Sequence, residues 1–311
     1  MKPIATLTLN PALDLSTATP RVRPTHKLRC APPQIEPGGG GINVARVAHA
    51  LGAPVTAIFP AGGGTGTTLE ALLRADGVPT AAVPIRGTTR ESFAVDETET
   101  GEQFRFVLPG PALSENEVAA LLERLRTLAP RPAFVVASGS LPAGCPDTVL
   151  ADVARIAQAD GARLIVDTSG PALAACEGSR AYLIKPSLRE LEELVGKTLP
   201  DIPAAMAAAR DLRARGFAEV VVVSLGEAGA LLVADATALH LPAIPVRVES
   251  TVGAGDSMVA AMTVALARGE PLPAVLRYGL AGGAAAVTTQ GSALARREDV
   301  ERLYAEASSS A

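Results

Sequence analysis

The sequence predicts an α/β fold in which helices cover both faces of a mainly parallel sheet, with a small extra β layer outside it. From about residue 130, short apolar runs alternate with amphipathic stretches, which is typical of strands joined by crossover helices. The four valines at residues 220–223 lack polar alternation, as in strands covered on both faces. Two further stretches, about 15–36 and 88–108, have extended, alternating side chains and turn residues instead.

The elements follow in chain order. We expect a first strand at residues 4–9 and, after the two extended stretches, strands at 134–138, 164–167, 182–185 and 220–224. We expect helices at 44–51, 148–159, 188–195, 204–215, 256–267, 272–288 and 297–306. No linker or charge block divides the chain, and it contains no repeat of fixed period, so one domain over residues 1–311 is expected. The stretches 15–36 and 88–108 suit a lid over a site, or an interface.

Composition excludes several classes of protein. Of the 311 residues, 48% are apolar and 19% charged, which disfavours disorder, and no apolar run reaches the roughly 18 residues of a membrane span. Lys and Arg total 28 against 32 acids, a net charge of −4 that offers no positive field for nucleic acid or an anionic membrane. Three cysteines without CxxC spacing, three scattered histidines and no signal segment make the cytoplasm the expected location and a carboxylate the expected base.

The strongest local motif is residues 250–256, Ser-Thr-Val-Gly-Ala-Gly-Asp, which opens an apolar helical run. Glycines let backbone amides turn toward one point, and a helix N-terminus adds roughly half a positive charge, so Gly253, Ala254 and Gly255 predict an anion hole. Asp256 on the same turn is then placed to take a proton from an attacking hydroxyl. The alternative is that Gly255 and Asp256 only cap the helix.

Two glycine runs form the second signal. Residues 38–43, four glycines followed by Ile42 and Asn43, predict close approach of a polyol or phosphate to the main chain, with a flexible loop as the alternative. Residues 62–66 lack the full GxGxxG register, and the strand expected roughly 20 positions later, residues 80–83, has no acidic residue, which disfavours a dinucleotide fold. Residues 196–198, Gly-Lys-Thr, are not a Walker loop, because Leu191 stands where that loop needs its first glycine.

Charged residues elsewhere suggest further roles. Lys27, Arg29, Arg90 and Arg105 lie in the two stretches assigned to the lid and are either solvated cations or a site for a substrate phosphate. Residues 185–190 follow a strand; Ser187 and Glu190 have capping-box spacing, and Glu190 could alternatively help to hold a metal–water shell near nucleotide phosphates beside Lys185. Asp14, beyond the first strand, is a turn residue or a ligand for substrate hydroxyls.

Taken together, these residues resemble the ribokinase-like (PfkB) sugar kinases over nearly the whole chain. The amino-terminal signature of that family matches residues 38–43 with 62–66, and its carboxy-terminal signature matches 250–256. Within the family the chain is most similar to the bacterial type 2 6-phosphofructokinases, in segments 6–9, 27–30, 36–46, 57–63, 101–107, 138–142 and 221–226. The resemblance implies a three-layer α/β/α sandwich with a β lid, and ATP-dependent phosphorylation of fructose 6-phosphate at O1 in glycolysis.

The resemblance also implies roles for particular residues. Asp256 would be the general base, and the amides of residues 253–255 would cradle the migrating phosphoryl group. The sugar would contact Asp14, Gly39, Gly40, Asn43 and Ser140, and its 6-phosphate Lys27, Arg90 and Arg105, with Arg90 a candidate for donation by a partner subunit. ATP would lie against Lys185, Ser187, Ser224, Gly226 and Gly229. A monovalent cation such as K⁺ would lie near Ser250, Val252, Ala286 and Gly291.

One departure from the family pattern concerns the metal. The family usually has Asn where this chain has Ser187, in an Asn-x-x-Glu motif, but Glu190 is retained, so Mg²⁺ held through water is still expected. The expected assembly is a homodimer formed through the lid. Three alternatives stay open at this point: a kinase for fructose 1-phosphate or tagatose 6-phosphate, a non-catalytic sugar-phosphate or nucleotide sensor, and a nicotinamide oxidoreductase using residues 62–66.

Overall fold

The main sheet forms the centre of the molecule. The computed structural model describes residues 1–289 and 294–309, and within these residues the main sheet has nine strands in the order β13-β12-β11-β10-β9-β8-β1-β4-β5. The strands from β11 to β5 in that order are parallel, and β12 and β13 are antiparallel. Their bounds are β1 Ile4–Leu7, β4 Val55–Ala61, β5 Thr80–Pro84, β8 Phe134–Ser138, β9 Arg163–Asp167, β10 Ala181–Ile184, β11 Ala218–Ser224, β12 Ala230–Val233 and β13 Ala238–Leu241.

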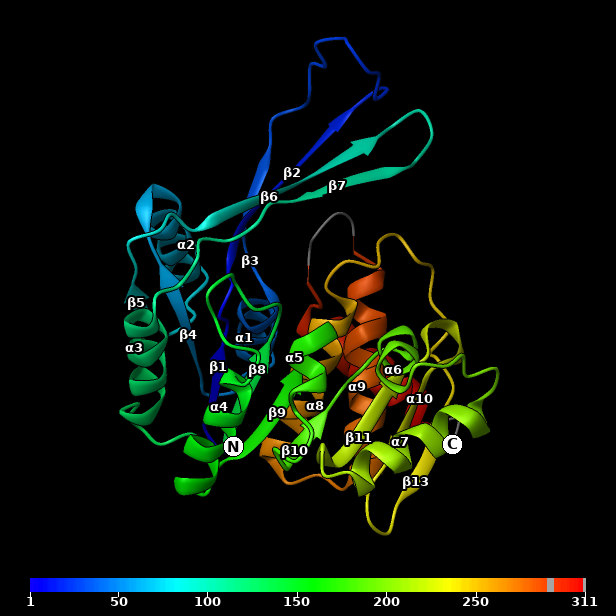
Figure 1. Ribbon diagram of the computed structural model, residues 1–311. Helices are drawn as coiled ribbons and strands as arrows, with labels where there is room; N and C mark the ends of the chain where they lie inside the picture. The colour runs from blue at the N-terminus through cyan, green and yellow to red at the C-terminus, as the bar shows by residue number, and fades with distance from the viewer. Residues whose placement is uncertain (290–293, 310–311) are drawn as a thin grey trace.

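Helices cover both faces of this sheet, which gives three layers (Figure 1). One apolar core joins the sheet to α1 Gly40–Ala50, α2 Gly63–Ala75, α8 Ala254–Arg268, α9 Leu272–Val287 and α10 Arg297–Ser309. A second core, on the other face, includes α3 Glu115–Arg126, α4 Val149–Ala159, α5 Gly170–Ala174, α6 Leu188–Val195 and α7 Ile202–Ala214. A 3₁₀ turn, η1 Gly226–Ala228, follows β11. The predicted α/β/α sandwich is confirmed.

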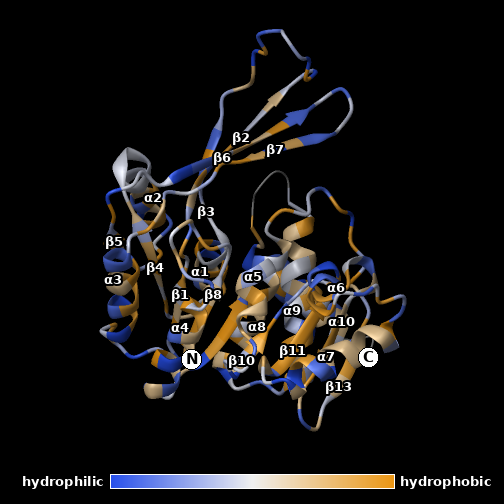
Figure 2. Ribbon diagram, in the orientation of Figure 1, coloured by the Kyte–Doolittle hydropathy of each residue, from blue (hydrophilic) through white to orange (hydrophobic). Residues whose placement is uncertain are grey.

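The valine run shows why the sequence pattern was informative. Val220 and Val222 lie in the first core, Val221 and Val223 lie in the second, and all are buried. A strand with helices on both faces has no solvent side, so polar alternation disappears. The strands are accordingly among the most apolar parts of the molecule (Figure 2).

The extra β layer is a four-stranded sheet, which we call the lid. Its order is β3-β2-β6-β7, with β2 Ala12–Thr19, β3 Gln34–Gly38, β6 Arg90–Glu97 and β7 Gln103–Val107. Strands β2 and β6 are parallel, and the outer pairs are antiparallel. The prediction of a small layer from these stretches is confirmed, although strand pairing begins at Ala12 rather than 15. The lid projects from the carboxyl edge of the main sheet (Figure 1).

The strand order identifies where a site should form. β1 lies between β4 and β8, so the chain winds in opposite directions on either side of it. In parallel α/β sheets, ligands bind beyond the carboxyl ends of the strands at such a switch point. The segments that follow β1, β8, β9, β10 and β11 all reach this edge.

Some local predictions were wrong or incomplete. The first strand ends at Leu7 rather than Leu9, and the antiparallel strands β12 and β13 were not expected. Each has only four residues, β12 being wholly apolar and buried, and their position at the sheet edge depends on the pairing of β12 with β11 and of β13 with β12. In the described residues, every helix is too short or too polar to cross a membrane.

Candidate active site

Asp256 lies in the first turn of α8, where the two principal motifs meet. Gly253 precedes the helix with φ 72°, a left-handed conformation that favours glycine. The first amides of a helix have no intrahelical acceptor, so Ala254 and Gly255 begin a positively polarised helix end. The Asn43 side chain, from α1, donates a hydrogen bond of 2.8 Å from Nδ2 to Oδ2 of Asp256. Residues 38–43 and 250–256 therefore form one site.

The pKa of the Asp256 carboxyl group is shifted toward neutral pH. Its pKa is raised to about 7, mainly by desolvation in the surrounding protein, with a smaller contribution from the negative charge of Asp167 and a still smaller one from that of Asp14. The hydrogen bond from Asn43 and the charge of Lys185 oppose this shift. A carboxylate with a pKa near 7 is a suitable general base at physiological pH.

Lys185 and Asp167 form an ion pair beside this base. Lys185 Nζ lies 3.1 Å from Asp167 Oδ1, and both side chains are largely buried. Burial lowers the pKa of Lys185, but the charges of Asp167, Glu190 and Asp256 outweigh it and raise that pKa overall, so the ammonium group stays charged. A Cβ on Gly255 would lie 3.7 Å from Lys185 Nζ, which places the ammonium group next to the start of α8.

Asp167 was missed in the sequence, although a usable signal existed. It ends β9, as Lys185 directly follows β10, and parallel neighbouring strands bring their carboxyl ends together. In the sequence, Asp167 is only the last residue of the strand expected at 164–167.

The glycines of residues 38–41 serve close packing of the chain against itself. A Cβ on Gly40 would lie 2.4 Å from Ser138 Oγ, and one on Gly41 would lie 2.4 Å from Thr8 Oγ1. The start of α1 therefore rests directly on the ends of β1 and β8. Close approach to the main chain was predicted; the structure shows the neighbour to be the sheet edge, and this contact fixes Asn43 opposite Asp256.

The second glycine run has a similar packing role. A Cβ on Gly62 would lie 1.9 Å from the Gly87 carbonyl oxygen, and Gly62 N donates to Thr89 Oγ1 at 3.1 Å. Because the chain itself fills this space, Gly62 offers no room for a pyrophosphate. This contact connects α2 to the base of lid strand β6.

The lid presents a polar face to the site. By strand register, Asp14 of β2 lies beside Glu36 of β3 and Ser92 of β6. Asp14, Arg105 and Val252 line one groove between the lid and the loop before α8. Desolvation raises the pKa of Asp14, against the charges of Arg90 and Arg105, so both cations act on this carboxyl group.

The predicted phosphate-binding cations are not all brought together. Arg90 begins β6 at the base of the lid, and its guanidinium donates to Asn10 O, Ser92 Oγ and Leu108 O. Lys27 is exposed in the connection 20–33, at the outer end of the lid (Figure 1). Within one chain, Arg90 and Arg105 are near Asp14, and Lys27 stands apart.

Ser140 is connected to the lid through Asn10. Asn10 Nδ2 donates to Ser140 Oγ at 3.0 Å, and Asn10 O accepts from Arg90. Asn10 was not among the predicted site residues. It stands between a strand and Pro11, a position that sequence reasoning assigns to a turn.

The predicted nucleotide residues gather at the ends of β10 and β11. Ser187 and Ser224 form a parallel bridge, and Ser224 N donates to Pro186 O at 3.1 Å. Gly226 begins η1, which directly follows this strand end. Gly229 has φ 91°, and a Cβ there would lie 2.0 Å from Leu241 O, so the turn needs glycine. These residues lie at or just beyond the ends of β10 and β11, and Lys185, which directly follows β10, adjoins Asp256. We call this set the rim.

Ser187 and Glu190 form the capping box that their spacing predicts. Ser187 N donates to Glu190 Oε2 at 2.7 Å, and Glu190 N donates to Ser187 Oγ at 3.3 Å. Oε2 of Glu190 is thereby used, and Oε1 has no hydrogen bond in the part of the chain that the structure describes. Among the described residues, no cluster of three or more His, Cys, Asp or Glu side chains could hold a metal ion by itself. The donor set fits an ion held mainly by nucleotide phosphates and water.

The residues expected around a monovalent cation are only partly placed. Ser250 N donates to Val287 O at 3.3 Å, so the loop containing Ser250 and Val252 adjoins the end of α9. The Ala286 carbonyl already accepts from Thr289 N and Oγ1, at 3.1 and 2.7 Å. Gly291 lies outside the described residues.

The sequence of this chain matches a protein family and several named proteins. A family model described as pfkB family carbohydrate kinase matches residues 8–298. The chain is 52% identical over 301 residues to a Mycobacterium tuberculosis protein named ATP-dependent 6-phosphofructokinase isozyme 2, covering 97% of this chain and 88% of that protein. The Escherichia coli protein of the same name is 45% identical over 303 residues, covering 97% and 98%.

Solved structures give the same result. Phosphofructokinase-2 from Escherichia coli in complex with potassium superposes with a TM-score of 0.94 at 44% identity, covering 99% of this chain and all of the other. The same protein has been solved with fructose-6-phosphate and in a tetrameric inhibited form, both with TM-scores of 0.93. A ribokinase from Arabidopsis thaliana, at 21% identity, has the same fold with a TM-score of 0.77 over 97% of this chain and 98% of the other.

Proposed function

Because this chain belongs to the pfkB family of carbohydrate kinases, we propose that it transfers the γ-phosphoryl group of ATP to O1 of fructose 6-phosphate. The products are fructose 1,6-bisphosphate and ADP, the chemistry of a glycolytic step. The names of the relatives from Mycobacterium tuberculosis and Escherichia coli support this acceptor. The observation that carries the proposal is Asp256, held by Asn43 at the start of α8 with a pKa raised to about 7.

The reaction assigns one task to each part of the site. Asp256 accepts the proton of the O1 hydroxyl, O1 forms a bond to the γ-phosphorus, and the bond from that phosphorus to the β–γ bridging oxygen breaks to release ADP. The amides of Gly253, Ala254 and Gly255 stabilise the negative charge of the transferring group. Phosphoryl transfer requires little covalent help from a protein, so positioning and charge provide most of the catalysis.

The sugar is proposed to bind between the lid and the start of α1. Asp14, Gly39, Gly40, Asn43 and Ser140 would contact the sugar itself. Arg105 would hold the 6-phosphate, since a guanidinium group binds phosphate oxygens in pairs. Arg90, whose guanidinium already donates to Asn10 O, Ser92 Oγ and Leu108 O, would add its positive charge and its remaining N–H. The connection 20–33, which contains Lys27, lies at the outer end of the lid, whereas Arg90 lies at its base, so we propose that Lys27 contributes to the site of a second subunit.

The nucleotide is proposed to lie on the rim formed by Lys185, Ser187, Ser224, Gly226 and Gly229. Mg²⁺ would be held by the phosphates and by water bound to Glu190, and when bound it neutralises phosphate charge. The suggested ligands of K⁺ are Ser250, Val252, Ala286 and Gly291, but the Ala286 carbonyl is engaged with Thr289, and no step is assigned to the cation.

The proposed assembly is a homodimer formed through the lid, in the cytoplasm. On the face of the lid opposite Asp14, one apolar residue from each of the four strands forms a row in register: Ile35, Leu15, Phe93 and Phe106. Phe93 and Phe106 stack at 4.9 Å and are 39% and 45% exposed. Such an apolar face is typical of a surface that a second subunit covers.

A coupled assay of ADP release tests the proposal. The purified chain is supplied with ATP and, in separate reactions, fructose 6-phosphate, fructose 1-phosphate, tagatose 6-phosphate or unphosphorylated sugars. We expect kcat/KM to be highest for fructose 6-phosphate. A higher value for fructose 1-phosphate or tagatose 6-phosphate would assign the chain to those substrates. ATP binding without turnover of any sugar would indicate a sensor, and binding of NAD in preference to ATP would indicate an oxidoreductase.

A further inference from the structure

Three of the four chain crossings between the lid and the rest of the molecule meet at Asn10; the fourth leads from β3 to α1. The first crossing is Asn10 itself, between β1 and β2. The second is Arg90, at the start of β6, whose Nε and Nη2 donate to the Asn10 carbonyl at 3.3 and 3.1 Å. The third is the return from β7, where Leu108 O accepts from Arg90 Nη1 at 3.2 Å. Arg90 and Asn10 thus hold all three crossings at the base of the lid.

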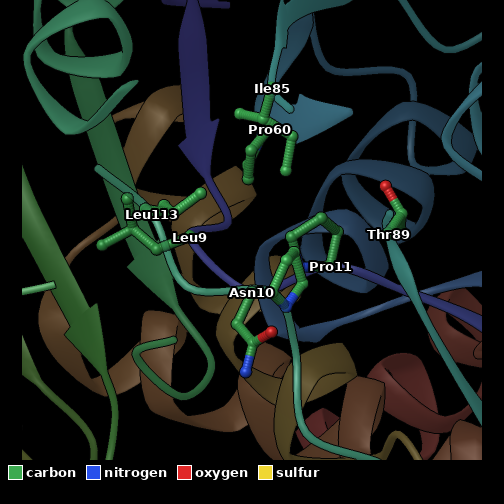
Figure 3. Close-up of a pocket in the computed structure, with 8 residues that line it drawn as sticks. Leu9, Asn10, Pro11, Pro60, Ile85, Thr89 and Leu113 are labelled. Carbon is green, nitrogen blue, oxygen red and sulfur yellow. The ribbon is translucent and has the colours of Figure 1, made fainter. Parts of the chain in front are cut away.

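The side chain of Asn10 extends this cluster to the core. Its Nδ2 donates to Ser140 Oγ, which belongs to the segment after β8. In the close-up of the neighbouring apolar pocket, the Asn10 amide points away from Pro60 and Ile85 (Figure 3). One residue therefore connects Arg90, through its carbonyl, with Ser140, through its amide.

The environment of Asn10 argues against a purely stabilising role. Its Oδ1 is buried without a hydrogen-bond partner in the described part of the chain. A buried acceptor left unsatisfied costs stability, which offsets the gain from the bond to Ser140. Gly110 leaves the space that the amide occupies, since a Cβ there would lie 2.0 Å from Oδ1.

We infer that Asn10 is a positioning residue that fixes Ser140 relative to Arg90, and thereby fixes the distance between the contacts to the sugar and to its phosphate. This inference rests on the proposed acceptor, fructose 6-phosphate. ATP is proposed to bind at the ends of β10 and β11, outside the cluster of Asn10, Arg90 and Ser140. Loss of the Asn10 amide should therefore affect one substrate and not the other.

The test compares steady-state kinetics of Asn10→Ala with the wild type. We expect the KM for fructose 6-phosphate to rise about 3- to 10-fold, the range that loss of one hydrogen bond produces, and the KM for ATP to change by less than about twofold. The melting temperature should stay close to that of the wild type, because the unsatisfied oxygen is removed with the bond. Gln158→Ala is the matched control. It removes an exposed hydrogen bond from the Gln158 side-chain amide to Ser179 O, and it should change neither KM.

A second variant tests the same idea without altering Asn10. Gly110→Ala should displace the amide, lower the melting temperature and raise the KM for fructose 6-phosphate. In the double variant Asn10→Ala/Gly110→Ala the added methyl group has space, so the melting temperature should recover while the KM stays high.

The outcomes separate the two proposals. A wild type that does not phosphorylate fructose 6-phosphate would contradict the proposed function. An active wild type combined with an unchanged KM for the sugar phosphate in Asn10→Ala, or with equal rises for both substrates, would overturn the positioning role. So would a double variant whose melting temperature stays as low as that of Gly110→Ala.

Discussion

At Asp256, stability and reactivity are set by the same surroundings. Enclosure by protein and the charge of Asp167 raise the pKa to about 7, against a usual value near 3.8. A raised pKa of an acid in the folded state means that the native protein holds the proton more tightly than the unfolded chain does. The stability that this proton provides is present at low pH and is lost as the pH rises from about 4 to about 7.

The activity of the wild type should rise over the pH range in which this contribution to stability is lost. The base works only when deprotonated, so kcat/KM for fructose 6-phosphate should fall about tenfold per pH unit on the acid side of about pH 7. A pH–rate profile at constant ionic strength measures this. An acid limb near pH 4, the ordinary range of a carboxyl group, would contradict the assigned environment of Asp256.

Replacing Asp167 separates its charge from that of Asp256. In Asp167→Asn, the negative charge that raises the pKa of Asp256 is lost, while the positive charge of Lys185 that lowers this pKa remains, so the pKa of Asp256 falls. We expect the acid limb of kcat/KM to move to lower pH and the KM for ATP to rise, because Lys185 loses its partner. An acid limb that stays in place or moves to higher pH would show that Asp167 does not act on the base.

At the scale of elements, the start of α1 depends on the absence of a side chain. Gly40→Ala would place a Cβ 2.4 Å from Ser138 Oγ and 2.8 Å from Gly139 N, and backbone cannot move aside easily. We expect a loss of about 1–3 kcal/mol in the free energy of unfolding, the usual cost of overpacking, together with lower activity as Asn43 shifts. Denaturant titration measures the first effect.

Gly64 provides the matched control for this substitution. It also stands in the first turn of a helix, but a Cβ there meets nothing within 4 Å. Gly64→Ala should leave stability unchanged or raise it by up to about 1 kcal/mol, since alanine favours helix. Equal losses for the two variants would show that the contact between α1 and β8 is not the cause.

The helices and strands also show which features could be predicted from the sequence alone. Strands such as β11 were predictable because burial on both faces removes polar alternation. The position of Asp256 in the first turn of a helix was predictable because glycines precede an acid at the start of an apolar helical run. Asp167 and Asn10 were missed because their roles come from neighbours distant in the chain, Lys185 in one case and Arg90 with Ser140 in the other. Spacing along the sequence does not record such contacts.

For the whole molecule, the lid explains why a second subunit is expected. Its polar face, with Asp14, is turned to the site, while Ile35, Phe93 and Phe106 point the other way and are exposed. Small lid sheets with one apolar face are stable when that face is covered.

A charge on this face should separate the subunits. Phe106→Lys is expected to shift the protein toward monomers in analytical ultracentrifugation and to raise the KM for fructose 6-phosphate if Lys27 acts across the interface. Val248→Lys, at another exposed apolar residue outside the lid, is the control and should keep the assembly of the wild type. An unchanged sedimentation coefficient for Phe106→Lys would place the contact between subunits elsewhere.

The central claim, that Asp256 removes the proton from the sugar hydroxyl, is tested most directly by the kcat of Asp256→Asn at pH 8. We predict that kcat falls at least about 100-fold, while the melting temperature stays equal to or above that of the wild type, because the amide avoids the cost of an enclosed negative charge. Asp152→Asn, at an ion pair with Arg155 on α4, should keep full activity. A kcat for Asp256→Asn within a few-fold of the wild type would contradict the account.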